Sequence, residues 1–130
     1  MNFTKTTFYS FSILAYMAQN KDVVVSASHI HEKLNIPYFY LRTLLNELKN
    51  HNLLTVERGR NGGFSLARDK SHIFLSEIIA VTEGHDPFAK CIMGFTDCPL
   101  DKRCYMHDKW IKVKSELLDI LKKTSLDDLK

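Results

Sequence analysis

Apolar residues recur at helical spacing near the start of the chain. Phe11, Leu14, Ala15 and Ala18 follow the i, i+3, i+4, i+7 pattern. This pattern places them on one face of an amphipathic helix, which we expect over residues 7–19.

Two further helices are predicted between residues 26 and 50. Ser26 is a favourable N-cap for a helix that reaches Leu34, and Asn35 suits a left-handed stop. Pro37 suits the first turn of the next helix. That helix repeats leucine on its inner face, at Leu41, Leu44, Leu45 and Leu48. Its opposite face carries Phe39, Arg42, Thr43 and Asn46.

A hairpin is predicted directly after the third helix. Residues 54–56 and 64–66 are suited to two short strands, and the segment between them reads Arg-Gly-Arg-Asn-Gly-Gly at 58–63. Asn-Gly is typical of a tight hairpin turn. Helix, short turn, helix and hairpin is the order of a winged helix-turn-helix. We therefore predict a mainly α fold with a small β-hairpin wing.

The last third of the chain is predicted to end in a long helix. Residues 74–81 form a fourth helix with Ile78 and Val81 inward, and glycines and prolines in 84–103 indicate a long loop. A last helix is predicted from Cys104 to about Lys123. Its apolar stripe, at spacings of four and three, consists of Met106, Trp110, Val113, Leu117 and Ile120. A small domain does not need so long an apolar helix for its own core, so we expect a dimerisation helix. We expect residues 125–130 to be frayed.

These elements predict three regions in one globular chain. They are a DNA-binding domain over 1–83, a cysteine-bearing sensor loop over 84–103, and a dimerisation helix with its tail over 104–130.

The chain has 130 residues, 45% of them hydrophobic, which is ordinary for one domain. It has no apolar run of about 18 residues and reads poorly as a signal peptide, so we expect a cytoplasmic protein without a membrane span.

The basic excess of the chain is concentrated in one segment. Eighteen Lys and Arg against 15 Asp and Glu give a net charge of +3. Residues 42–68 alone hold five basic and two acidic side chains. Arg58, Arg60 and Asn61 make a slim basic hairpin tip, which suits a minor groove or its phosphates. The alternative is a solvated hairpin with incidental arginines.

The outer face of the third helix is suited to reading DNA. A helix-turn-helix places its second helix in the major groove, where side chains reach base edges. Arg42 can donate to guanine, and Thr43 and Asn46 can bond to bases or phosphates. Phe39 either contacts a thymine methyl group or packs under a neighbouring loop.

The chain resembles the bacterial winged-helix regulators that include IscR, NsrR and CymR. The resemblance rests on Thr4, Leu41-x-x-Leu-Leu, Leu53-Leu54 and, most specifically, the wing Arg58-Gly-Arg-Asn-Gly-Gly-Phe64-x-Leu66. It implies a homodimeric repressor or activator on double-stranded DNA with a palindromic operator. It also implies that Arg58 enters the minor groove and that Pro37, Phe39 and Arg42 occupy base-reading positions. Those three residues depart from the small polar and acidic ones of IscR.

All three cysteines, Cys91, Cys98 and Cys104, lie within 14 residues. Thiolates are soft ligands for iron–sulfur clusters, zinc or copper(I). Zinc sites usually contain Cys-x-x-Cys pairs, which are absent, and a wide spacing across a Gly/Pro-containing loop favours a cluster. Three structural thiols, a zinc site and a cluster-free thiol switch remain alternatives.

The resemblance also implies the fourth ligand. His107 lies three residues after Cys104, the spacing that supplies the histidine ligand of the 2Fe–2S cluster in IscR. The partner subunit's aspartate that is the ligand in NsrR-type proteins corresponds to Phe8, which cannot coordinate. We therefore expect His107 and a 2Fe–2S cluster rather than a 4Fe–4S form. Weaker substitutes are Asp97, Asp101 and His85.

Two other classes of function are weighed against a cluster-controlled regulator. One is a cluster-free winged-helix regulator that uses a thiol switch or responds to a protein or small-molecule effector. The other is an enzyme, which we do not expect. The chain has no glycine-rich phosphate loop after a strand, no serine elbow and no paired carboxylates of the kind that hydrolases use.

Overall fold

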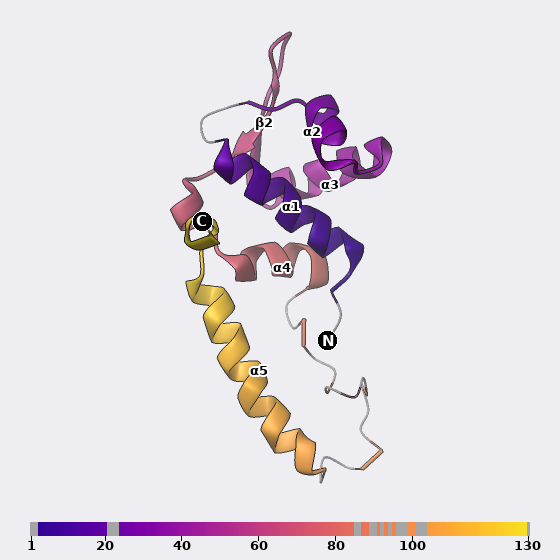
Figure 1. Ribbon diagram of the computed structural model, residues 1–130, viewed down its shortest axis with the longest axis vertical. Helices are drawn as coiled ribbons and strands as arrows, with labels where there is room; N and C mark the ends of the chain where they lie inside the picture. Colours follow the sequence, from indigo (N-terminus) through magenta and orange to yellow (C-terminus); the bar gives the residue numbers. More distant parts are fainter. Residues whose placement is uncertain are drawn as a thin grey trace.

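The computed structural model describes residues 3–20, 24–84, 87–88, 91, 93, 95, 99–100 and 104–129. The elements in chain order are α1 (Lys5–Gln19), α2 (Ala27–Leu34), α3 (Tyr38–Asn50), β1 (Leu54–Glu57), β2 (Gly63–Leu66), the short 3-10 helix η1 (Lys70–His72), α4 (Leu75–Glu83), α5 (Tyr105–Lys123) and the 3-10 helix η2 (Leu126–Leu129). The mainly helical fold with a hairpin wing is confirmed. The wing points away from one end of the body, and α5 extends from the other (Figure 1).

Helix α1 begins two residues earlier than the apolar pattern predicts. The Thr4 hydroxyl accepts the amide N–H of Thr7 and caps the first turn. Phe11 and Ala15 lie only at the edge of the buried face, which is displaced from the predicted one. That face consists of Thr7, Ser10, Ile13, Leu14, Met17 and Ala18. The apolar periodicity missed it because two of these side chains are polar.

Helices α2 and α3 form the predicted helix-turn-helix. The Ser26 hydroxyl accepts the amide N–H of His29, and Asn35 ends α2 in the left-handed conformation at φ 54°. Pro37 directly precedes α3 instead of lying in its first turn. The four leucines of the predicted inner face of α3 are all buried.

The hairpin is an antiparallel pair with Leu54 opposite Leu66 and Glu57 opposite Gly63. Residues 58–62 therefore form a five-residue loop, and the positive φ falls on Gly59, at 114°, rather than on an Asn-Gly pair. Val25 extends the sheet by exchanging two backbone hydrogen bonds of 2.8 Å with Phe64. A Cβ atom on Gly63 would lie 2.5 Å from the carbonyl oxygen of Val25, so only glycine fits there.

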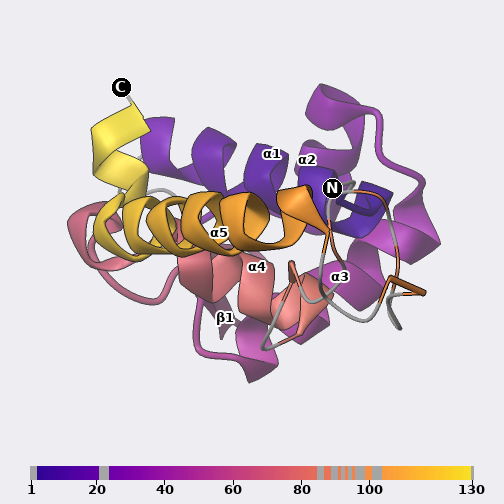
Figure 2. The same cartoon turned by 90° about the horizontal axis from the view of Figure 1, so that it is seen from below.

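Helix α4 lies between α1 and α5 and contacts both (Figure 1). Seen from below, α5 lies in front of α1 and α4 (Figure 2). The amide N–H of Phe74, before the first turn of α4, donates to Glu77 at 2.9 Å. Trp110 belongs to the face of α5 that turns toward its own chain, and it is only 7% exposed. Leu118 and Leu121 line a groove between α4 and α5 together with Ile79.

The prediction that residues 125–130 are frayed is wrong for residues 125–129. Leu126 is buried in the main core, and its amide N–H donates to the carbonyl of Ile73 at 2.9 Å. Ser125 forms a bridge with Phe74, and the amide of Leu75 donates to Thr124 at 2.9 Å. The tail after α5 is thus tied back to the segment before α4. None of the helices in the described residues is long and apolar enough to cross a membrane.

Candidate DNA-binding surface and cysteine segment

The outer face of α3 and the wing line an open groove of about 480 Å³. Tyr38, Arg42, Asn46 and Lys49 line it from α3. The start of α2 and the wing residues Glu57, Arg58 and Gly59 complete it. The four predicted outward residues of α3 are all exposed, and two of them, Arg42 and Asn46, line this groove together with Arg58 of the wing. A basic groove of this kind complements the phosphate backbone of DNA.

Phe39, near the start of α3, is the most exposed of the large apolar side chains that the structure describes. Its side chain is 86% exposed, so it does not pack under a neighbouring loop. Its ring meets Tyr38 edge-on at 5.9 Å, and Tyr38 meets His31 edge-on at 5.7 Å. The Thr43 hydroxyl donates to the Phe39 carbonyl oxygen at 3.2 Å, so that donor is already used within the helix.

The wing arginines and the base of the hairpin differ in their ion pairs. Arg58, Arg60 and Asn61 are exposed, and no carboxylate in the described part of the chain forms an ion pair with either arginine. Arg68, by contrast, pairs with Glu77 at 3.0 Å. Within the part of the chain that the structure describes, the two wing arginines that the sequence assigns to DNA are thus without an ion pair.

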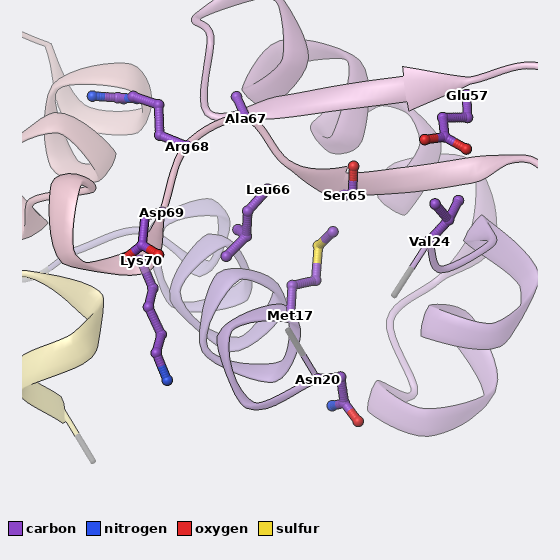
Figure 3. Close-up of a pocket in the computed structure, with 10 residues that line it drawn as sticks. All are labelled: Met17, Asn20, Val24, Glu57, Ser65, Leu66, Ala67, Arg68, Asp69 and Lys70. Atoms are coloured by element: carbon purple, nitrogen blue, oxygen red, sulfur yellow. The ribbon is translucent and has the colours of Figure 1, made fainter. Parts of the chain in front are cut away.

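A second groove, of about 410 Å³, lies on the side of the hairpin that faces the end of α1 (Figure 3). Met17 of α1 and Asn20, which caps the end of α1, line it together with Ser65 and Leu66 of β2. Figure 3 shows Met17 pointing from the end of α1 toward the hairpin and Leu66 pointing from β2 toward the helix. No residue assigned to DNA or to a metal from the sequence lines this groove.

Cys104 and His107 share the first turn of α5. Cys104 is the N-cap, and its Sγ accepts the amide N–H of Met106 at 3.4 Å. Its carbonyl oxygen accepts the amide N–H of His107 at 3.0 Å. Both side chains are half-buried. The predicted ligand pair is therefore held on one turn of a regular helix.

Cys91 is also half-buried, and its Sγ accepts the amide N–H of Phe95 at 3.4 Å. Among the described residues, no three His, Cys, Asp or Glu side chains form a group that could hold a metal ion. Cys98, the third predicted thiolate, lies outside the described residues. So do the weaker substitutes His85, Asp97 and Asp101.

Two contacts beside the cysteine segment, residues 84–104, were not predicted from the sequence. Glu83, the last residue of α4, accepts hydrogen bonds from the amide of Thr4 at 2.8 Å and the hydroxyl of Thr7 at 2.5 Å. Burial raises the pKa of Glu83, but the hydrogen bonds from Thr7 and Thr4 outweigh it and hold that pKa below the ordinary value of 4.5. Phe88 is buried between Phe3, at 5.7 Å, and Trp110, at 6.3 Å between ring centroids.

The predicted dimerisation stripe contains both exposed and buried side chains. Met106, Val113 and Ile120 are exposed and follow one another at intervals of seven residues. Leu117 is half-buried at the edge of this stripe. Trp110, which the spacing assigns to the dimer interface, is instead buried against Phe88 of its own chain. Its position on the helix turns it toward the face that packs on α4.

A winged helix-turn-helix with a basic reading surface and a long terminal helix defines a transcriptional regulator. Residues 3–130 match the Rrf2 family, described as iron-dependent transcriptional regulators, and the chain belongs to this family. It is 31% identical to an HTH-type transcriptional regulator of Aquifex aeolicus, over 99% of this chain and 91% of that one. It is 30% identical to the regulator NsrR of Halalkalibacterium halodurans, over 99% and 90%. These relatives are regulators, not enzymes.

Solved structures agree with this assignment. CymR, the global cysteine regulator of B. subtilis, superposes with a TM-score of 0.81 at 24% identity, over 99% of this chain and 95% of that one. IscR of T. potens superposes with a TM-score of 0.75 at 26% identity, over 99% and 85%. The resemblance to regulators that include IscR, NsrR and CymR is confirmed.

Proposed function

We propose that this chain is a regulator whose operator binding is controlled by an iron–sulfur cluster on Cys91, Cys98, Cys104 and His107. The observation that carries the proposal is the pair Cys104 and His107 on the first turn of α5, in a chain of a family described as iron-dependent. The IscR-like spacing of the pair favours a 2Fe–2S cluster.

The residues present fit such a group. Thiolates and a neutral imidazole are the donors that iron–sulfur clusters use. The sulfurs of Cys91 and Cys104 each accept a backbone amide N–H, and such hydrogen bonds tune the reduction potential of a cluster. When bound, the cluster would supply a redox-active centre that an oxidant or nitric oxide can alter.

The chain connects this segment to the DNA-binding domain. Phe88 lies three residues before Cys91 and packs against Trp110 of α5. Glu83 lies at the end of α4 and caps the start of α1. Rearrangement of residues 84–103 would change both contacts, and so the position of α5 relative to α1. A chemical change at the cluster would then shift the equilibrium between two arrangements of the DNA-contacting helices.

DNA recognition is proposed to follow the winged-helix mode. Helix α3 enters the major groove with Pro37, Phe39, Arg42, Thr43 and Asn46 toward the bases and phosphates. The wing brings Arg58, Arg60 and Asn61 to the minor groove. A dimer formed through the exposed stripe on α5 would place two such surfaces on a palindromic operator. In this proposal residues 1–83 form the DNA-binding domain, residues 84–103 form the sensor loop, and residues 104–130 form the dimerisation helix and its tail.

A cluster-free thiol switch is the second candidate. CymR of Staphylococcus aureus, 25% identical over 97% of this chain, superposes with a TM-score of 0.74, and a structure of its oxidised form is known. Cys91 and Cys104 are free and half-buried here. In this alternative, peroxide oxidises a cysteine thiol, and no iron is needed.

The absorption spectrum and the iron and sulfide content of the anaerobically purified protein separate the two candidates. We expect a coloured protein with about two irons per chain if the cluster is 2Fe–2S. His107→Ala should change the spectrum and lower iron retention, whereas His72→Ala, an exposed histidine in η1, should not. A colourless protein that binds its operator tightly and is unaffected by Cys98→Ala would contradict the cluster. Loss of operator binding on peroxide treatment of that colourless protein would support the thiol switch.

A further inference from the structure

We propose that Phe39 reads the 5-methyl group of a pyrimidine in the operator, an inference that rests on the proposed entry of α3 into the major groove. Phe39 is the second residue of α3 and is 86% exposed. Helical side chains tilt toward the N-terminus of their helix, so this ring projects past the end of α3. The N-terminal residues of a recognition helix are those that contact base edges.

An aromatic chain runs from His31 through Tyr38 to the Phe39 ring. His31 is anchored by a hydrogen bond of 2.6 Å between its Nδ1 and the carbonyl oxygen of Ile36. Tyr38 meets the His31 ring edge-on, and Phe39 meets the Tyr38 ring edge-on at 5.9 Å. The edge-on contact with Tyr38 favours one orientation of the Phe39 ring, which lowers the entropy cost of placing it on DNA.

The chemistry of the ring restricts what it can read. Phenylalanine has no hydrogen-bond donor or acceptor, and the 5-methyl group of thymine is the apolar feature of the major groove. Unmethylated cytosine instead presents an amino donor, whose desolvation against a phenyl ring is unfavourable. A 5-methylcytosine carries the same methyl group. The shared target is therefore a pyrimidine 5-methyl group, and methylation of cytosine at that position would raise affinity.

The neighbours of Phe39 on the helix place this contact in the recognition site. Arg42 lies one turn further along the same face, about 4.5 Å along the axis at the usual rise per residue. Arg42 lines the groove shared with the wing. We therefore expect the methyl group within about one or two base pairs of the base that Arg42 contacts.

Replacement of single thymines by deoxyuridine tests the proposal, because uracil differs from thymine only by the methyl group. Operator sequences are first selected from a random duplex pool with the full-length chain. Each thymine of a half-site is then replaced by deoxyuridine, or by cytosine and 5-methylcytosine with the matching guanine. Affinities are measured for the unmodified chain, Phe39→Ala and Phe39→Leu.

At one thymine per half-site, removal of the methyl group should weaken binding by the unmodified chain about fourfold, as expected for one buried methyl. The same removal should have no effect on Phe39→Ala and a reduced effect on Phe39→Leu. At that position 5-methylcytosine should bind more tightly than cytosine. Deoxyuridine effects that are equal in all three proteins would overturn the proposal while leaving DNA binding intact. Failure to enrich any sequence would overturn it together with the proposed docking of α3.

Discussion

The hydroxyl of Thr7 donates a hydrogen bond of 2.5 Å to the carboxylate of Glu83, across 76 residues of sequence. The amide and the hydroxyl of Thr4 donate to the same oxygen at 2.8 and 3.0 Å. One carboxylate thus joins the first turn of α1 to the last turn of α4, directly before the cysteine segment begins.

Glu83→Gln should lower the free energy of unfolding at pH 7 by about 1 kcal/mol, since hydrogen bonds to a charged acceptor become bonds to a neutral one. The folded-state pKa of Glu83 lies below 4.5, so its contribution is fully present above pH 4.5 and is lost as the pH falls through the lowered pKa. Urea unfolding from pH 7 to pH 3 measures this. Below pH 4.5 the free energy of unfolding should fall less in the Glu83→Gln variant than in the unmodified chain. Glu116→Gln, on the exposed side of α5, is the control and should behave like the unmodified chain.

Gly63→Ala should distort the wing, because the added Cβ atom would meet the backbone of Val25 at 2.5 Å. Overpacking of this kind typically costs about 1–3 kcal/mol. We expect a lower melting temperature and weaker operator binding, measured by calorimetry and by fluorescence anisotropy. Ser65→Ala, which removes only a surface hydroxyl bonded to Thr55, is the control. Unchanged melting of Gly63→Ala would show that the hairpin can move away from Val25.

Local periodicity was sufficient to predict the elements that pack by a repeated pattern. The four buried leucines of α3 and the capping residues Ser26 and Asn35 depend on neighbours within a few residues, so the sequence alone identified them. The helix-turn-helix and its wing followed from their order.

Contacts between distant segments could not be predicted in this way. The bond between Glu83 and Thr7, the packing of Phe88 on Trp110 and the docking of Leu126 each depend on which elements meet in space. Trp110 fits the heptad-like stripe by spacing alone. Only the packing of α5 on α4 shows that the Trp110 side chain turns toward its own chain. Thr7 and Ser10, on the inner face of α1, were missed because an apolar pattern does not count polar side chains.

Arg58→Ala and Arg60→Ala should each reduce the dependence of operator affinity on salt. Removal of one phosphate-binding side chain lowers the slope of log affinity against log salt concentration by about 0.9. Titrations at several salt concentrations give this slope. Arg68→Ala is the matched control, because Arg68 pairs with Glu77 and lies away from the groove of α3. Equal slopes for the wing variants and the unmodified chain would exclude phosphate binding by the wing.

Phe88→Leu should weaken the coupling between the cysteine segment and DNA binding. The smaller side chain keeps an apolar core at a cost of about 1 kcal/mol but cannot pack edge-on against Trp110. We expect the ratio of operator affinities with and without iron–sulfur loading to fall toward one. Phe95→Leu, whose side chain is exposed in the same segment, should keep the ratio of the unmodified chain. An unchanged ratio in Phe88→Leu would mean that the signal bypasses this pair of rings.

Val113→Asp should convert the proposed dimer into a monomer while leaving the fold of the chain intact. Val113 is 53% exposed and lies seven residues from both Met106 and Ile120, so its charge would fall in the middle of the exposed apolar stripe. Trp110 lies one turn before Val113, about 60° around the helix, and is buried against Phe88, so the exposed position of Val113 can change without removing that contact. Sedimentation velocity at several concentrations measures the oligomeric state, and circular dichroism checks the helix content.

Ile111→Asp supplies the matched control for this prediction. Ile111 is 50% exposed on the same helix, close to the exposure of Val113, but because it lies two residues earlier it points to a different side. We expect this variant to remain dimeric. If both variants were monomeric, general weakening of α5 rather than loss of a specific interface would explain the result. If both were dimeric, the stripe of Met106, Val113 and Ile120 would not be the dimer interface. Because the half-sites of a palindrome are bound by two linked surfaces, Val113→Asp should also bind the operator more weakly than Ile111→Asp.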